Sequence, residues 1–248
     1  MKFHRFAILA LAALLASPAA AQTPTPASGA EKPVRHLAFS LTVATNYSSE
    51  LRGIKDIADP VGASGSTTQS RDRADGTIVC DILAARNEGD LLIDVWETMR
   101  GQKTPVSRIV LHADGQFNYL PDQKALASEA ALLVPFLART YIGPPPHTAG
   151  ETWTVNDNLD NFKATTIFKV SAVRAPADIS VEFEESFTVA GTQASSGVIR
   201  GRANYDPTKV VPREGSFDTR SRSQQGDQYR VVSTVLDFTL KEDSFAKR

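Results

Sequence analysis

A two-residue alternation of apolar and polar side chains runs through most of this chain and constrains its fold more than any other feature. In residues 178–190, DISVEFEESFTVA, Ile179, Val181 and Phe183 fall on one side of an extended strand, with polar residues between them. Successive strand residues face opposite sides of a sheet. A sheet with one buried apolar face and one solvent-exposed polar face is typically antiparallel, because parallel sheets bury both faces.

The same alternation recurs near both ends of the chain. Leu37, Phe39 and Leu41 share a face in residues 36–47, and Leu236 and Phe238 share one in residues 229–240. Turn signals such as NEGD at residues 87–90 separate the runs. We therefore predict a mainly β protein: a single curved antiparallel meander, or half-open barrel, of about nine strands.

One connection allows a register to be predicted. If the turn in residues 204–213 is symmetric about Lys209, Arg200 lies opposite Asp218 and Gly201 lies opposite Phe217. This pairing predicts an ion pair on the solvent-exposed face and an aromatic ring over a glycine on the buried face.

Residues 121–140, PDQKALASEAALLVPFLART, break the alternation. Leu126, Ala130, Leu133 and Leu137 recur at helical spacing, which predicts an apolar stripe on a helix. Pro135 should end or kink this helix, because proline lacks the N–H and clashes with the preceding turn. We expect the helical segment to pack on the concave face of the sheet.

The stretch after the helical segment, residues 141–155, contains three consecutive prolines and then Trp153. Consecutive prolines favour an extended polyproline conformation, so the stretch is interpreted as a rigid connector into the next strand. A second interpretation stays open, in which it forms the rim of a cavity with His147 and Trp153 at the mouth.

The N-terminus is typical of a secretory signal. Lys2 and Arg5 flank the start of an apolar run at residues 6–16, and Ala19 and Ala21 form a small-x-small cleavage pattern. We expect a signal peptide at residues 1–21, cleaved after Ala21, a disordered linker at residues 22–33 and a single β-rich domain at residues 34–248. The protein is thus predicted to be periplasmic or secreted, with no transmembrane segment.

Charge and motifs argue against several classes of function. The formal net charge of −1 provides no overall basic character for nucleic-acid binding. Serine-nucleophile, metal-ligand and phosphate-loop motifs are absent from the sequence, so we predict no catalytic residues, no metal site and no cofactor. Glu184 and Glu185 are adjacent in a strand, face opposite sides and cannot share a proton. A hydrolase built from distant residues stays open, and Cys80 is interpreted as a small buried apolar residue.

The signal peptide, the long antiparallel meander and the inserted helical segment resemble the periplasmic lipoprotein-carrier family. The resemblance covers most of the chain after the linker but includes no specific motif, and no functional residue of the family aligns with a position here. It implies a half-open β-barrel that is closed by helices and holds acyl chains on its concave face. The helix, the proline-rich loop and the spacing of Gly150 and Trp153 also resemble uncharacterised secreted β proteins, which imply no function.

We therefore predict a soluble periplasmic binding or carrier protein for an apolar or lipid-like ligand. The candidate residues lining its cavity are Leu37, Phe39, Leu41, Phe136, Trp153, Ile179, Val181, Phe183, Leu236 and Phe238. The alternative is a structural or protein-interaction component of the bacterial cell envelope whose core is packed and which has no ligand cavity. The expected partner is a hydrophobic small molecule or lipid in the first case, and an envelope protein in the second.

Overall fold

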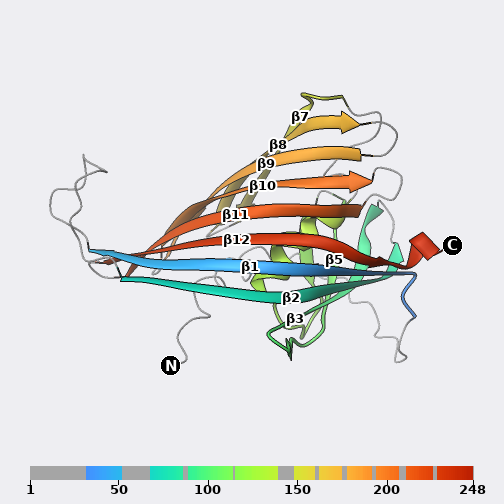
Figure 1. Ribbon diagram of the computed structural model, residues 1–248, viewed down its shortest axis with the longest axis horizontal. Coiled ribbons are helices and arrows are strands. Elements are labelled where there is room, and N and C mark those ends of the chain that lie inside the picture. The colour runs from blue at the N-terminus through green and yellow to red at the C-terminus, as the bar shows by residue number, and fades with distance from the viewer. Residues whose placement is uncertain are drawn as a thin grey trace.

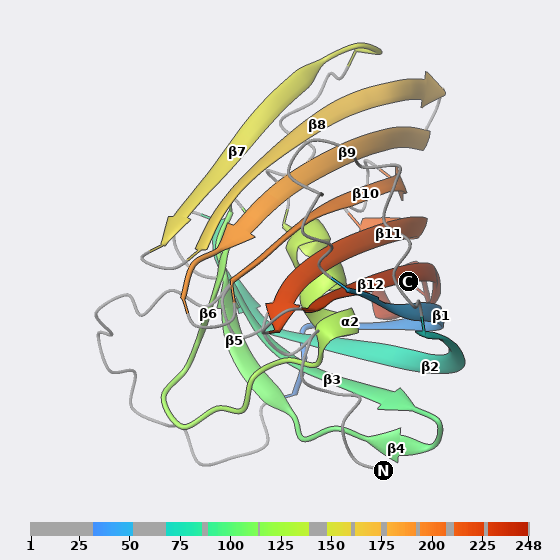
Figure 2. The ribbon, with the colours of Figure 1, turned by 90° about the vertical axis from the view of Figure 1, so that its left-hand side faces the viewer.

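A computed structural model describes residues 32–51, 68–85, 89–113, 115–138, 148–159, 162–174, 178–191, 194–206, 211–225 and 228–247. They form one large, curved antiparallel sheet with a short helical segment against its concave face (Figures 1 and 2). In these ranges no helix has the length and apolar character needed to span a bilayer. The expected signal peptide, most of the expected linker and His147 lie outside the described residues.

Twelve strands lie within the described ranges, compared with about nine expected. The strands are β1 Arg35–Leu51, β2 Thr68–Ala85, β3 Leu91–Met99, β4 Gln102–Lys103, β5 Ser107–Leu111, β6 Phe117–Tyr119, β7 Thr152–Leu159, β8 Phe162–Arg174, β9 Asp178–Val189, β10 Ser195–Asp206, β11 Val211–Gln225 and β12 Gln228–Asp243. Two of these, β4 and β6, have only two and three residues, too few to show a period in the sequence. The predicted fold class, a curved antiparallel meander with one helical segment, is confirmed.

The first described strand, β1, lies in the middle of the sheet and not at an edge. The strand order is β6-β5-β3-β2-β1-β12-β11-β10-β9-β8-β7, with β4 paired to β3. The first half of the chain therefore proceeds from β1 to the edge at β6. It then crosses the concave face through α2 (Ser128–Leu133) and η2 (Val134–Leu137), and resumes at the opposite edge with β7 (Figure 2). The second half returns to the centre, where β12 pairs with β1. A short 3-10 turn, η4 (Ser244–Lys247), follows β12.

The register predicted for β10 and β11 is confirmed. Arg200 pairs with Asp218 and Gly201 pairs with Phe217. The expected ion pair forms instead with the other neighbouring strand, since Arg200 Nε donates to Glu184 Oε2 at 2.8 Å. Carboxylates flank Arg200 on both sides of β10, and this long side chain reaches the one on β9.

Phenylalanine rings occupy the space above glycines on the concave face. A Cβ atom at Gly201 would lie 2.3 Å from Phe183 Cε1 and 2.8 Å from Phe217 Cδ1. Gly215 has the same relationship to Phe238, whose Cε1 would lie 2.5 Å from the added atom. These glycines leave the room that lets large rings lie flat across neighbouring strands.

The helical segment is shorter than its apolar pattern suggests. The α-helix begins at Ser128, and the predicted break is confirmed, because α2 ends at Leu133 and Pro135 lies in the first turn of η2. The preceding residues are held by strand side chains in place of helical bonds. Ser107 Oγ donates to the Lys124 carbonyl at 2.6 Å, and the Leu126 N–H donates to Tyr119 Oη at 3.0 Å. All four residues of the predicted stripe are buried: Leu126, Ala130, Leu133 and Leu137.

Candidate functional site

The candidate site is the concave face of the sheet beneath α2 and η2. Nine of the ten residues predicted to line a cavity belong to one buried hydrophobic cluster there, and Trp153 packs against it. The nine, with exposures of 0–8%, are Leu37, Phe39, Leu41, Phe136, Ile179, Val181, Phe183, Leu236 and Phe238. The structure thus brings all ten predicted residues to one face.

Six aromatic rings form a continuous belt across the strands of this face. The belt, in order of contact, consists of Trp153, Phe168, Phe183, Phe217, Phe238 and Phe39. Trp153 stacks on Phe168 with centroids 5.1 Å apart and planes 8° apart. At the other end, Phe39 meets Phe238 edge-on at 6.0 Å. The belt leads from the edge strand β7 to the central strand β1, and it presents a wide apolar surface with few rotatable bonds.

Phe136 of η2 inserts into the middle of this belt from the helical side. Its ring centroid lies 4.9 Å from that of Phe183, 5.0 Å from that of Phe217 and 6.3 Å from that of Phe168. The Phe136 carbonyl also accepts a hydrogen bond from the buried Tyr205 hydroxyl at 3.3 Å. The centre of the aromatic surface is therefore filled by a side chain of the helical segment formed by α2 and η2, which we call the cover, and not by a side chain of the sheet.

Two residues at the centre of the site were not in the predicted set. Phe168 and Phe217 both contact Phe136, and both are almost fully buried. Phe217 was predicted only as the ring above Gly201. Phe168 continues the alternation of Ala164 and Thr166 on β8, so applying the two-residue period to every strand would have identified it.

A row of side chains that is polar except for Ile199 lies next to the belt, two residues further along each strand toward the C-terminal end of β1. The registers place in this row Thr166, Glu185, Ile199, Thr219, Thr234 and Thr45. Thr166 Oγ1 donates to Glu185 Oε2 at 2.9 Å, and the hydroxyls of Thr45 and Thr234 are 3.2 Å apart. Glu185 is thus a carboxylate on the concave face, whereas its neighbour Glu184 pairs with Arg200 on the convex face, as the alternation predicted.

Trp153 carries a polar group for which the described residues supply no partner. Its Nε1 atom is buried and has no hydrogen-bond acceptor among them, although the ring itself stacks on Phe168. A buried donor left without an acceptor costs about 1–3 kcal/mol. The edge of the aromatic belt therefore has a donor that an oxygen atom could satisfy.

Charged and hydroxyl groups gather beyond the polar row, where β1, β2 and β12 extend. Burial, followed by the nearby negative charge of Asp72, raises the pKa of Tyr47 above its ordinary value. The Arg230 guanidinium lies 5.5 Å from the centre of the Tyr47 ring, and Arg100 forms an ion pair with Asp72. The concave face therefore changes from apolar in the middle to polar at this end.

The histidines of the described residues are engaged in local pairs. His112 Nδ1 lies 2.9 Å from Asp90 Oδ2, and its Nε2 lies 2.8 Å from Asn118 Nδ2. His36 Nδ1 lies 2.6 Å from Asp81 Oδ1. Across the part of the chain that the structure describes, no three His, Cys, Asp or Glu side chains are arranged to hold a metal ion.

Comparison with known proteins gives distant similarity to a solved structure and no match to a protein-family model or a curated protein. A solved structure of lipovitellin, concerned with lipid–protein interactions, is similar to it with a TM-score of 0.45 and 10% identity. The match covers 86% of this chain and 26% of the lipovitellin chain, so this chain spans about a quarter of that protein. At this level of similarity the match assigns neither a family nor a function.

Proposed function

We propose that the protein binds an apolar, lipid-like ligand on its concave face, under the cover formed by α2 and η2. The observation that carries this proposal is the position of Phe136. Its ring, which belongs to the cover, fills the space between Phe168, Phe183 and Phe217 of the sheet, and we call this space the seat. A phenylalanine ring buries about 150–250 Å². A segment of acyl chain can bury a comparable apolar area in the same seat.

The architecture allows this exchange without damage to the sheet. The strand pairs on either side of the seat, β8 to β12, are joined to one another and not to the cover. Outward movement of η2 would break the hydrogen bond between Tyr205 and the Phe136 carbonyl and expose Phe168, Phe183 and Phe217. Opening would therefore leave the hydrogen bonds between strands intact, and its cost is the loss of the contacts between the cover and the sheet.

The polar groups of the site favour a ligand with a neutral carbonyl group. The Trp153 Nε1–H requires an acceptor, and the threonine hydroxyls of the polar row can donate to one. Glu185 already places a carboxylate on this face, so a second negative charge there is unfavourable. We therefore expect an acyl ester or amide to bind more tightly than the free fatty acid of the same length.

We further propose that this binding takes place outside the cytoplasm, in the periplasm or after secretion. Support comes from residues 1–21, whose basic start, apolar run and small-residue site are typical of a secretory signal. N-terminal sequencing of the protein recovered from periplasmic extract should begin at Gln22. Recovery of uncleaved chain in the cytoplasm would contradict this location.

The two tryptophans provide a direct test of the ligand site. Trp153 belongs to the concave belt, whereas Trp96 lies on the convex face beneath Lys103 Nζ, 4.5 Å from its ring. A brominated fatty acyl methyl ester quenches tryptophan fluorescence at contact range. We expect quenching in the wild type and in a Trp96→Phe variant, and loss of quenching in a Trp153→Phe variant.

Native mass spectrometry supplies the independent measurement. Protein purified from its own compartment should retain a lipid-like adduct, and delipidated protein should take up the brominated ester. Ligand-free protein that takes up no ester, or quenching that follows Trp96, would overturn the proposed function.

An interaction protein remains the second candidate, because the sheet has an open edge within the described part of the chain. Among those residues β7 pairs with β8 on one side and with no strand on the other. An unpaired edge can accept a strand from a partner protein. Crosslinking from Thr154→Cys that captures one envelope protein, together with absence of lipid adducts, would favour this candidate.

A further inference from the structure

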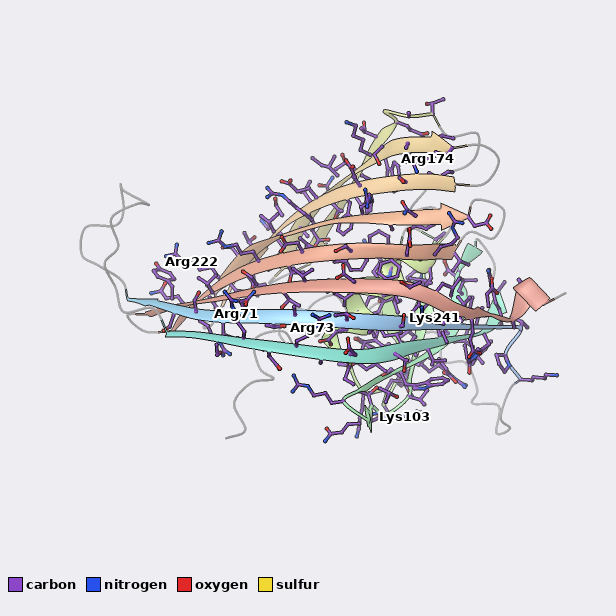
Figure 3. The ribbon with its side chains drawn as sticks, in the orientation of Figure 1. Arg71, Arg73, Lys103, Arg174, Arg222 and Lys241 are labelled. Atoms are coloured by element: carbon purple, nitrogen blue, oxygen red, sulfur yellow. The ribbon has the colours of Figure 1, made fainter. Side chains whose placement is uncertain are left out.

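The convex face carries a segregated group of basic side chains at one end, which the ligand site does not use. Arg71 on β2, Arg220 and Arg222 on β11 and Lys163 on β8 are exposed there. Figure 3 shows Arg71 and Arg222 at the same end of the sheet, on the side away from α2. We call these four residues the basic end patch.

The registers show that the patch occupies two adjacent rows across seven strands, β8 to β12 followed by β1 and β2. The first row is Thr165, Ser186, Val198, Arg220, Ser233, Asn46 and Arg71. The second row is Lys163, Thr188, Ser196, Arg222, Val231, Ser48 and Gln69. These fourteen positions include four cations and no carboxylate.

Acidic positions lie on both sides of the patch: at the outer end the register places Glu50 opposite Tyr229, one row beyond Arg222, and others follow toward the middle of the face. In that direction the next row contains Glu184 and Asp218 with Arg200 and Arg73, and the row after it contains Glu182, Asp237 and Asp75. The whole chain has a formal net charge of −1, so the patch does not follow from an excess of basic residues. Strand pairing has separated the charges along the face.

Three of the four patch cations, Arg71, Arg220 and Lys163, are available to a partner. None of the ion pairs among the described residues involves Arg71, Arg220 or Lys163. Arg222 lies over the Tyr229 ring, with Cζ 3.7 Å from its centre. Arginine and tyrosine are both residue types favoured at membrane interfaces.

We propose that the basic end patch docks the protein on a membrane surface that carries anionic lipid headgroups. Arg71 and Arg220 are separated by three strand intervals, and so are Lys163 and Arg222, which places each pair of backbones about 14 Å apart. One phosphate or carboxylate cannot bridge such a gap. A surface with many separate anions provides one for each cation. This inference does not depend on the proposed ligand site.

Vesicle binding tests the proposal. The purified protein is sedimented with vesicles of phosphatidylcholine alone or with added phosphatidylglycerol. We expect binding only to the anionic vesicles and its loss at high salt, since exposed charges are screened. Each basic residue near an anionic surface contributes about a fivefold increase in affinity. The triple variant Arg71→Gln, Arg220→Gln, Arg222→Gln should bind about a hundredfold more weakly.

A matched variant controls for charge number. Lys169→Gln, Arg200→Gln, Arg202→Gln removes three exposed cations from the same face, but from the rows that also contain carboxylates. It should retain most of the vesicle binding. Equal loss in the two triple variants would overturn the assignment to the patch, and so would equal affinity for neutral vesicles.

A labelling experiment tests the same proposal with the arginines in place, so it does not depend on the folding of the arginine variants. An environment-sensitive dye on Ser196→Cys reports from within the patch, and the same dye on Ser216→Cys reports from the mixed rows. Both positions are exposed, and the native Cys80 is buried. Only the Ser196 label should change its emission on anionic vesicles. No change there, or binding to soluble polyglutamate in place of vesicles, would overturn the membrane proposal in favour of an acidic partner.

Discussion

The ring of Phe136 stacks on the ring of Phe217, with centroids 5.0 Å apart and planes 28° apart. Phe136 belongs to the short helical cover, and Phe217 belongs to a central strand of the sheet. This contact therefore holds the cover in place and also occupies the centre of the proposed ligand seat.

Replacement of Phe136 should lower the stability of the fold and at the same time strengthen ligand binding. Phe136→Ala leaves a cavity in a packed cluster, and we expect a loss of about 3–5 kcal/mol in the free energy of unfolding, measured with urea. The brominated ester should bind more tightly, since it no longer displaces a ring. Phe245→Ala removes a phenylalanine that is 47% exposed and serves as the control. Weaker ester binding by Phe136→Ala would contradict the proposed seat.

Gly201 should tolerate no side chain while the rings above it remain. Gly201→Ala places a Cβ atom 2.3 Å from Phe183 Cε1, and overpacking of this kind costs about 1–3 kcal/mol. Adding Phe183→Leu removes the ring atom that lies closest to the new Cβ, so the double variant should be more stable than the sum of the two single changes predicts. Chemical denaturation of the four proteins measures the coupling. Simple additivity would show that the rings do not determine the need for glycine.

Loss of the buried ion pair between the first and last strands should be costly. Arg35 donates to Asp243 through Nε at 3.1 Å and Nη2 at 2.9 Å, and both side chains are buried. Asp243→Ala removes the carboxylate from a buried guanidinium, and we expect a loss of about 3–5 kcal/mol in the free energy of unfolding. Arg200→Ala, which removes the exposed pair with Glu184, should leave the melting temperature unchanged. Similar effects of both variants would contradict the role of burial.

Alkaline pH should weaken the fold through Cys80. Burial is the main cause that raises the pKa of its thiol above the ordinary value of 9.0. The folded thiol keeps its proton while the unfolded thiol releases it, so the contribution is complete below pH 9 and falls as pH rises above it. One such proton corresponds to a slope of about 1.4 kcal/mol per pH unit.

The comparison of Cys80→Ala with the wild type isolates this contribution. Unfolding free energies measured by urea between pH 8.5 and 10 should fall less steeply in the variant. Above pH 10 the raised pKa values of Tyr47 and Tyr119 add a decline common to both proteins. Identical slopes below pH 10 would rule out the thiol as the source. The native thiol should also resist aqueous thiol reagents until the protein unfolds.

Local patterns predicted the faces of the strands and several details within them. The alternation assigned Ile179, Val181 and Phe183 to the buried face, and it separated Glu184 from Glu185. The turn after β10 predicted the pairing of Gly201 with Phe217. Pro135 indicated the end of the α-helix. Each of these rests on steric or hydrogen-bonding rules that act over a few neighbouring residues.

Strand order and the contacts that depend on it were not visible in the chain. The pairing of β1 with β12, the start of the second half at the edge strand β7 and the insertion of Phe136 were not predicted. Neither was the basic end patch as a whole, in which Arg71 and Arg220 lie in one row because β12 and β1 connect their strands in register.

Sequence alone determined which side chains face inward, because a two-residue period is a property of each extended strand by itself. Tertiary structure alone decided which strands are neighbours, where the cover lies and which charges share an end of the sheet. The physical reason is that backbone hydrogen bonds in a sheet are nearly the same for any antiparallel partner. The choice among partners is made by the packing of the whole sheet around its cover.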